Sequence, residues 1–156
     1  MPTLDALETL VKTHPFLAGI SPEYCEFFAE CASLRRFASQ QKIFHEGGEA
    51  DHFYLILVGS VALETWIPKR RNVTIQTLGA GDALGWSWYF PPHQWRYTAT
   101  THAPTDVISF SAAALRAKAE TNGEFREELL ARVSKTLIVR LESSRDQIVK
   151  LYSQLA

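Results

Sequence analysis

The sequence is short of cysteine, of net charge and of long apolar runs, and each shortage excludes a class of protein. Its 156 residues include two cysteines, too few for a small domain held together by disulfides. Cys25 and Cys31 stand six residues apart in a segment that looks helical, which places them on different faces of the helix. Because free cysteine is commonly buried, we expect two structural thiols rather than a redox pair.

The net charge of −1 argues against a free-standing nucleic-acid binder, because such domains carry a basic stripe. The basic run of Lys69, Arg70 and Arg71 stands between Pro68 and Asn72, so we interpret it as an exposed hairpin turn. No apolar run reaches the roughly 18–20 residues that cross a bilayer. The N-terminal segment lacks the basic start and apolar centre of a signal peptide. We therefore expect a cytoplasmic protein without a membrane partner.

The first 33 residues have the spacing of two helices. Leu4, Leu7 and Leu10 recur at helical intervals before the break at Pro15. Ser21 then precedes a proline and a glutamate, which is typical of a helix start. We predict N-terminal helices over residues 1–33.

Short strands with turns between them follow. Residues 53–58 form a continuous apolar run that is typical of a strand buried on both faces. Residues 61–66 and 73–77 alternate between apolar and polar, and residues 107–110 form a last short strand. This spacing is typical of an antiparallel sandwich or barrel. We predict an α+β, mainly β fold, with an antiparallel β-roll or jelly roll over residues 34–111.

The last segment, residues 112–156, is predicted to be helical. Ser111 can cap a first helix, which Asn122 and Gly123 would end. A long helix then runs from about Glu124 to the end, and at 1.5 Å per residue it spans about 45–50 Å. Its apolar seam has heptad spacing and consists of Leu130, Ser134, Leu137, Leu141, Ser144, Ile148, Leu151 and Leu155. We expect this helix to form a parallel homodimeric coiled coil; the alternative is a single helix folded over the roll. The whole chain, 1–156, is interpreted as one domain.

The stretch from Gly81 to Thr100 is unusually rich in large rings. Trp86, Trp88, Tyr89, Phe90 and Trp95 stand close together around two prolines. Rings at this density line a ligand pocket, form a partner surface, or fill a core.

Four motifs stand in an order and spacing that resemble a known family. They are Phe44–Glu49, with its Gly47 turn; Phe53–Leu63, with an internal Gly59; Leu78–Gly85, with its Gly81-Asp82 step; and Thr98–Thr100. With their flanking helices, they resemble the cyclic nucleotide-binding domain of the catabolite-activator and FNR-like regulators, over nearly the whole chain.

The resemblance implies a phosphate-binding cassette over residues 81–99. In the family a short helix opens after the glycine that corresponds to Gly85, and its free N–H groups face an anion. A glutamate after that glycine binds the ribose, and an arginine before the closing Ser/Thr pairs with the cyclic phosphate. The implied ligand-binding residues here are Gly85, Trp86, Ser87, Arg96, Tyr97, Thr98 and Ala99.

The sequence departs from the family at both charged positions. Trp86 stands where the glutamate belongs, and Tyr97 where the arginine belongs. Arg96 is one residue early, and in a strand that shift turns a side chain to the opposite face. It would serve only if the loop containing Pro91 and Pro92 had slipped. Because each lost charge-assisted bond costs about 1.5–3 kcal/mol, we expect no high-affinity cAMP binding.

Three interpretations of the cassette remain open. It is a remodelled pocket for another small molecule, a pocket filled by Trp86 and Tyr97 in a dimerisation or docking scaffold, or a weak cyclic-nucleotide site that uses Arg96. In a sensor, a ligand near Gly85 would favour one pose of the long helix, which a partner protein reads.

Two other functions are not expected. Regulators of this family carry a helix-turn-helix after the long helix, whereas this sequence stops at Ala156, so we expect no direct DNA binding. A cupin-like metalloenzyme would need closely spaced histidines. The candidates are His45, Glu46 and His52, with His93 or His102 later, and no H-x-H is present. His14 is interpreted as a solvated loop residue. We expect no catalytic residues, no metal and no cofactor.

Overall fold

The computed structural model describes residues 3–69 and 71–155, so Arg70, in the predicted hairpin turn, lies outside the description. The helices are α1 (Leu4–Thr13), α2 (Pro22–Glu30), α3 (Ala112–Thr121) and α4 (Gly123–Leu155). The strands are β1 (Ala32–Phe37), β2 (Lys42–Phe44), β3 (His52–Val58), β4 (Ser60–Ile67), β5 (Arg71–Gly79), β6 (Ala83–Leu84), β7 (Thr98–Thr101) and β8 (Thr105–Ser111). No helix among these residues is long and apolar enough to cross a membrane.

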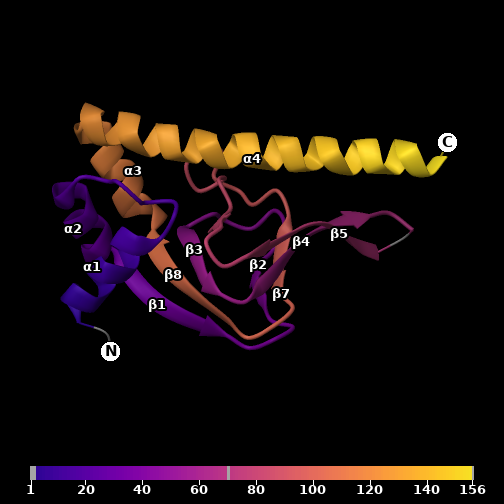
Figure 1. Ribbon diagram of the computed structural model, residues 1–156, viewed down its shortest axis with the longest axis horizontal. Helices are drawn as coiled ribbons and strands as arrows, with labels where there is room; N and C mark the ends of the chain where they lie inside the picture. The colour runs from indigo at the N-terminus through magenta and orange to yellow at the C-terminus, as the bar shows by residue number, and fades with distance from the viewer. Residues whose placement is uncertain (1–2, 70, 156) are drawn as a thin grey trace.

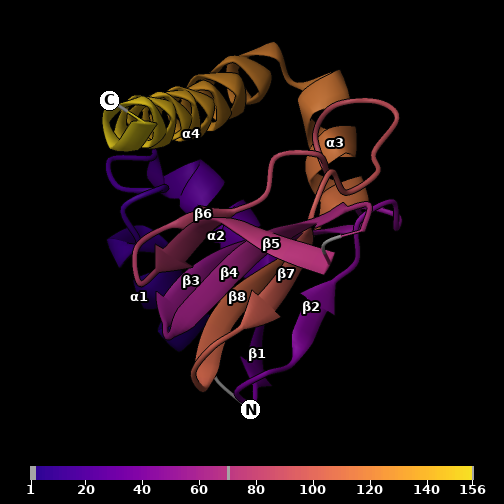
Figure 2. The same cartoon turned by 90° about the vertical axis from the view of Figure 1, so that its right-hand side faces the viewer.

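The strands form two antiparallel sheets that face each other as a roll (Figures 1 and 2). One sheet has the order β1-β8-β3-β6 and the other β2-β7-β4-β5. Helices precede and follow the strands. The predicted α+β fold, mainly β with an antiparallel roll, is confirmed.

Strand β3 is buried on both faces, as its apolar run predicts. Residues 53–56 are all buried. Phe53 packs on one face against Trp88, with ring centroids 4.7 Å apart, and Tyr54 packs on the other against Phe44, at 6.2 Å. Successive side chains of a strand point to opposite faces, so β3 packs against aromatic side chains on both faces of its sheet.

The N-terminal helices pack against the start of α4. Pro22 opens α2 behind Ser21, although the Ser21 side chain makes no capping hydrogen bond. The ring of Tyr24 meets that of Phe125 edge-on at 5.2 Å, and Phe28 meets Phe110 at 5.5 Å.

Cys25 is buried and its pKa is raised by burial. Cys31 is partly buried and both thiols are free.

Helices α3 and α4 follow the predicted boundaries closely. The Ser111 hydroxyl accepts a hydrogen bond from the Ala114 N–H at 3.2 Å, and α3 ends at Thr121, before Asn122. Helix α4 has 33 residues and runs over the full length of the roll (Figure 1). Its first turns bury Phe125, Leu129 and Val133, a spacing of four that keeps one face on the protein.

The prediction for His14 is wrong. The side chain is buried, its Nε2 lies 3.1 Å from the carbonyl oxygen of Ile56, and its Nδ1 accepts from the N–H of Phe16. This arrangement fixes the neutral tautomer with its proton on Nε2. Burial lowers the pKa of His14 below its ordinary value. The residue joins the end of α1 to the roll.

Candidate functional site

The cassette, residues 81–99, is anchored at both ends by the sheets. At its start, β6 pairs with Tyr54 and Leu55 of β3, and the Asp82 carboxylate accepts from the N–H of Gly79 at 2.9 Å. At its end, the Thr98 hydroxyl accepts from the N–H of Glu46 at 3.0 Å. Between these anchors the loop extends toward α3 (Figure 2), where Arg116 donates to the carbonyl of Trp88.

The short helix expected after Gly85 is not formed, and this expectation is wrong. Residues 86–92 make turns instead; the Tyr89 N–H donates to Trp86 O at 3.1 Å, and the His93 N–H to Phe90 O at 2.9 Å. Proline offers no N–H, so Pro91 and Pro92 cannot extend a helix hydrogen-bond ladder. The helix N-terminus that would bind an anion is therefore absent from this part of the described chain.

Trp95 fills the space beside Gly85. Its ring stacks on Phe44 with centroids 3.7 Å apart and planes 8° from parallel, and the residue is 3% exposed. Gly85 has a φ of +87°, and a Cβ atom there would collide with the Trp95 ring. In the sequence Trp95 is one ring among several. Its packing could not be predicted, because Trp95 and Phe44 are far apart in the sequence and no motif pairs them.

The predicted ligand-binding residues differ in how deeply they are buried. Tyr97 is 7% exposed, whereas Arg96 lies in solvent. Trp86 is partly buried and meets the Phe90 ring edge-on at 6.4 Å. Ala99 is fully buried in β7, opposite Leu63. The structure therefore brings Tyr97, Thr98 and Ala99 into the interior, holds Trp86 at its edge and leaves Arg96 outside.

Several buried polar atoms of the cassette have no hydrogen-bond partner among the described residues. They are Ser87 Oγ, Trp88 Nε1 and the Tyr97 hydroxyl. Burial raises the pKa of Tyr97 to about 12, and the positive charge of Arg140 opposes that shift. An unpaired buried polar group costs about 1–3 kcal/mol. A small polar molecule that formed hydrogen bonds with these atoms would therefore gain binding free energy.

Arg140 of α4 also belongs to this region, and sequence reasoning missed it. Its guanidinium donates to the carbonyl of Ala83 at 2.7 Å and to the side chain of Gln76 at 3.2 Å. Its Nε is buried with no partner in the described chain, and burial lowers the pKa of the group. More than 50 residues separate Arg140 from Ala83, so no motif could have paired them.

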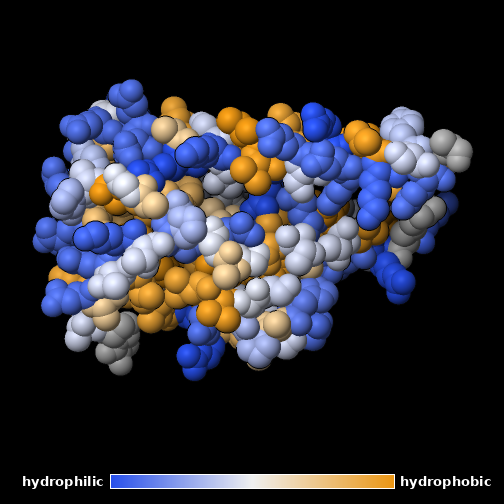
Figure 3. All heavy atoms as spheres, viewed as in Figure 1, coloured by the Kyte–Doolittle hydropathy of each residue, from blue (hydrophilic) through white to orange (hydrophobic). Residues whose placement is uncertain are grey.

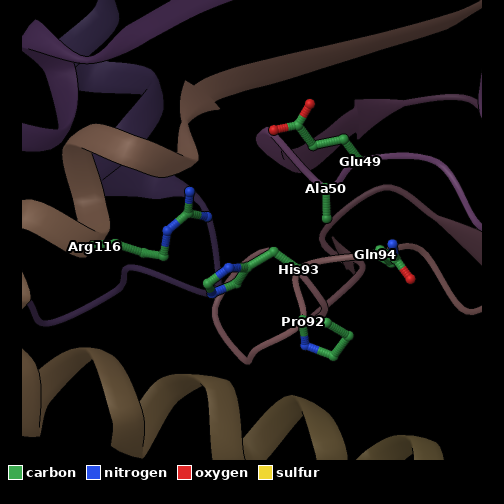
Figure 4. A pocket seen from close by; sticks show the side chains of 6 residues that line it. All are labelled: Glu49, Ala50, Pro92, His93, Gln94 and Arg116. Carbon is green, nitrogen blue, oxygen red and sulfur yellow. The ribbon is translucent and has the colours of Figure 1, made fainter.

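A cavity of about 390 Å³ lies on the outer side of the cassette loop, lined by Glu49, Ala50, Pro92, His93, Gln94 and Arg116. In Figure 4, Arg116 reaches from α3 toward His93, with Glu49 and Gln94 on the far side. Within this set, only His93 was considered from the sequence, as a metal ligand. The cavity lining includes neither Trp86 nor Tyr97, so it is not the predicted ligand site.

The metal site considered from the sequence has no geometric counterpart in residues 3–69 and 71–155, where no three His, Cys, Asp or Glu side chains gather closely enough to hold an ion. Glu46 instead accepts a hydrogen bond from Thr65. His52 lies 2.9 Å from the Asp51 carboxylate.

The predicted seam on α4 is mostly exposed. Leu141 is 71% exposed, Ile148 54%, Leu151 61% and Leu155 81%. Leu137 differs, because it packs partly against the core of the same chain. Apolar patches interrupt the hydrophilic surface along α4 in Figure 3.

The sequence matches a family model described as cyclic nucleotide-binding domain over residues 34–122. Among curated proteins, it is 28% identical over 119 residues to a CRP-like cAMP-activated global transcriptional regulator from Mycobacterium tuberculosis. That match covers 76% of this chain and 53% of the regulator, so the chain spans about half the length of this curated relative.

Solved structures share the fold. A cyclic nucleotide-binding domain from Methylobacillus flagellatus superposes with a TM-score of 0.78 at 22% identity, covering 94% of this chain and 83% of that one. The regulatory subunit of a cAMP-independent protein kinase A from Trypanosoma brucei superposes with a TM-score of 0.71 at 18% identity, covering 95% of this chain and 51% of that one.

Proposed function

The chain belongs to the cyclic nucleotide-binding domain family, and we propose that within it the chain is a regulatory module whose cassette is filled by its own rings. The observation that supports this most directly is Trp95, which stacks on Phe44 and occupies the space beside Gly85. The sequence favoured Trp86 and Tyr97 as the filling residues. The packing indicates Trp95 and Tyr97, with Trp86 at the edge.

The same geometry supports weak or absent cAMP binding. A cyclic phosphate needs a cation, and the position that carries it in the family holds a buried tyrosine, Tyr97. Arg96 faces solvent, and the chain before β7 would have to turn over for its side chain to reach the interior. A nucleotide would also have to displace the Trp95 ring. The curated relative is a transcriptional regulator, and we propose a regulatory rather than an enzymatic role here too.

The second part of the proposal is a homodimer through α4. The exposed apolar residues Leu141, Ile148 and Leu155 lie along one stripe of this helix. An exposed apolar stripe of this kind is typical of a protein–protein interface. The β4–β5 hairpin adds Trp66, which is 61% exposed, and β5 is tied to α4 by the Gln147 amide, which donates to the carbonyl of Ile75. A second copy of the chain would cover both surfaces. A downstream protein would then read the pose of the paired helices.

The buried unpaired atoms Ser87 Oγ and the Tyr97 hydroxyl favour a second candidate, a cassette that opens for a small polar molecule other than cAMP. Native mass spectrometry of protein purified from its own host separates the two candidates. A filled cassette predicts a dimer with no additional mass. A small molecule retained by the wild type, and lost in Tyr97→Phe, would overturn the filled cassette and establish the second candidate.

A further inference from the structure

A cavity of about 640 Å³ lies beside α4, away from the cassette loop. Its lining comes from the turn after α1 (Pro15, Phe16 and Ala18), from Gly81–Ala83 at the start of the cassette, and from α4 between Glu128 and Arg140. Sites for small molecules are typically about 300–1,000 Å³, so the cavity has the capacity for a small molecule. It shares no residue with the turns and rings between Gly85 and Ala99.

The charges around this cavity do not balance locally. Glu128 is paired with Arg132, whose Nη2 lies 2.7 Å from its carboxylate. The Asp82 carboxylate is held by the N–H of Gly79. The ion pairs found among the described residues include neither Lys135 nor Arg140, and Arg140 keeps a buried, unpartnered Nε. Three cations and two carboxylates therefore line the cavity, and one positive charge remains in excess, although Asp82 is near enough to Arg140 for its charge to act on the guanidinium.

The remaining wall is largely apolar. Pro15, Phe16 and Ala18 form one side, and Ala131 and Val139 form the other. Val139 is 60% exposed, and a bound apolar chain would remove part of that surface from water, at about 25 cal/mol per Å². Cations and apolar surface in one cavity match a ligand with an anionic head and an apolar body.

We propose that this cavity binds a small monocarboxylate with an apolar chain, with its carboxylate at Lys135 and Arg140 and its chain between Phe16 and Val139. A carboxylate accepts charge-assisted hydrogen bonds from both cations. The Arg140 guanidinium also donates to the carbonyl of Ala83. A ligand bound to Arg140 would therefore act on the contact that joins α4 to the entrance of the cassette.

A dimer through the seam leaves this cavity accessible. Val139 stands nine residues from Leu130 and nine from Ile148. At about 3.6 residues per turn, nine residues make about two and a half turns. Val139 therefore lies on the opposite side of α4 from the seam residues Leu130 and Ile148.

Calorimetric titration of the full chain with octanoate tests the proposal, with 1-octanol as the neutral probe of the same length. We expect saturable octanoate binding at one site per chain, and no matching site for the alcohol. Lys135→Glu should weaken octanoate binding by about tenfold or more, because it replaces a charge-assisted partner by a repelling one. Lys150→Glu makes the same change on the exposed end of α4 and should leave binding unchanged.

A second variant tests the apolar wall. Val139→Asp should also abolish octanoate binding, and as an exposed position it should not unfold the protein, which thermal unfolding checks. The proposal is overturned if the wild type shows no saturable octanoate binding, if the alcohol binds equally well, or if Lys135→Glu and Lys150→Glu weaken binding to the same extent.

Discussion

At the scale of single residues, the proposed filling of the cassette rests on Gly85 and Trp95. Gly85 has a positive φ, and the Trp95 ring lies where its side chain would be. Gly47 is a natural comparison, since it has a similar φ of +84° but open space where an added Cβ atom would lie. The two glycines therefore share the backbone requirement and differ in packing.

Gly85→Ala should destabilise the protein more than Gly47→Ala. Both variants carry the cost of a left-handed backbone, about 1–2 kcal/mol. Gly85→Ala adds a collision with a buried ring, and overpacking of this kind costs about 1–3 kcal/mol. Chemical denaturation of both variants measures the free energies of unfolding, and equal values would show that Trp95 is not packed against Gly85.

His14 should make stability depend on pH. Its folded-state pKa is lowered from 6.5 by burial, so the unfolded chain binds the proton more readily than the folded one. The free energy of unfolding should therefore be highest above pH 6.5 and fall as the pH drops below that value.

His14→Gln should flatten this dependence, because the amide can still donate to Ile56 O but does not titrate. His45→Gln, at an exposed position, is the control and should retain the wild-type slope. Urea denaturation between about pH 5 and pH 8 makes the comparison. A slope that His14→Gln leaves intact would mean that other groups cause the pH dependence.

At the scale of secondary structure, we propose a separate function for each of three sides of α4. One side holds the roll through Arg140 and Gln147, one presents the apolar seam, and one forms the wall of the larger cavity. The seam and the cavity lining share no residue, so the helix can combine association with ligand binding, whereas Arg140 belongs both to the side that holds the roll and to the cavity.

Leu141→Asp should convert the dimer to a monomer, since it places a charge in the middle of the seam. Val139→Asp is a matched control on the same helix; the two positions are similarly exposed, at 71% and 60%, and Val139 faces away from the seam. Sedimentation velocity distinguishes the outcomes. A dimer that survives Leu141→Asp, or a wild-type monomer, would contradict the proposed interface.

The sequence predicted the elements with strong local signals and missed those without. Strand β3 was evident from six consecutive apolar residues, 53–58, and α3 from its Ser111 cap. Strand β1 was missed because residues 33–36 are all exposed and show no alternation. The cassette helix was expected from the resemblance, and two prolines replaced it by turns. Arg140 and Trp95 act through partners distant in the sequence, which only the fold brings together.

At the scale of the whole molecule, the fold of the family is intact, and we propose that its ligand site is rebuilt. The roll, the cassette anchors and the long helix are all present. The cassette interior holds Trp95 and Tyr97, and a different cavity, beside α4, is lined with an excess of positive charge. We infer that the fold keeps its regulatory architecture with a changed input.

Calorimetric titration of the wild-type protein with cAMP tests the filled cassette most directly. We predict no binding tighter than the micromolar range, because the phosphate lacks a buried cation and the Trp95 ring occupies the space beside Gly85. A nanomolar dissociation constant for cAMP would contradict the account, since it would require both a displaced Trp95 and an arginine turned into the cassette.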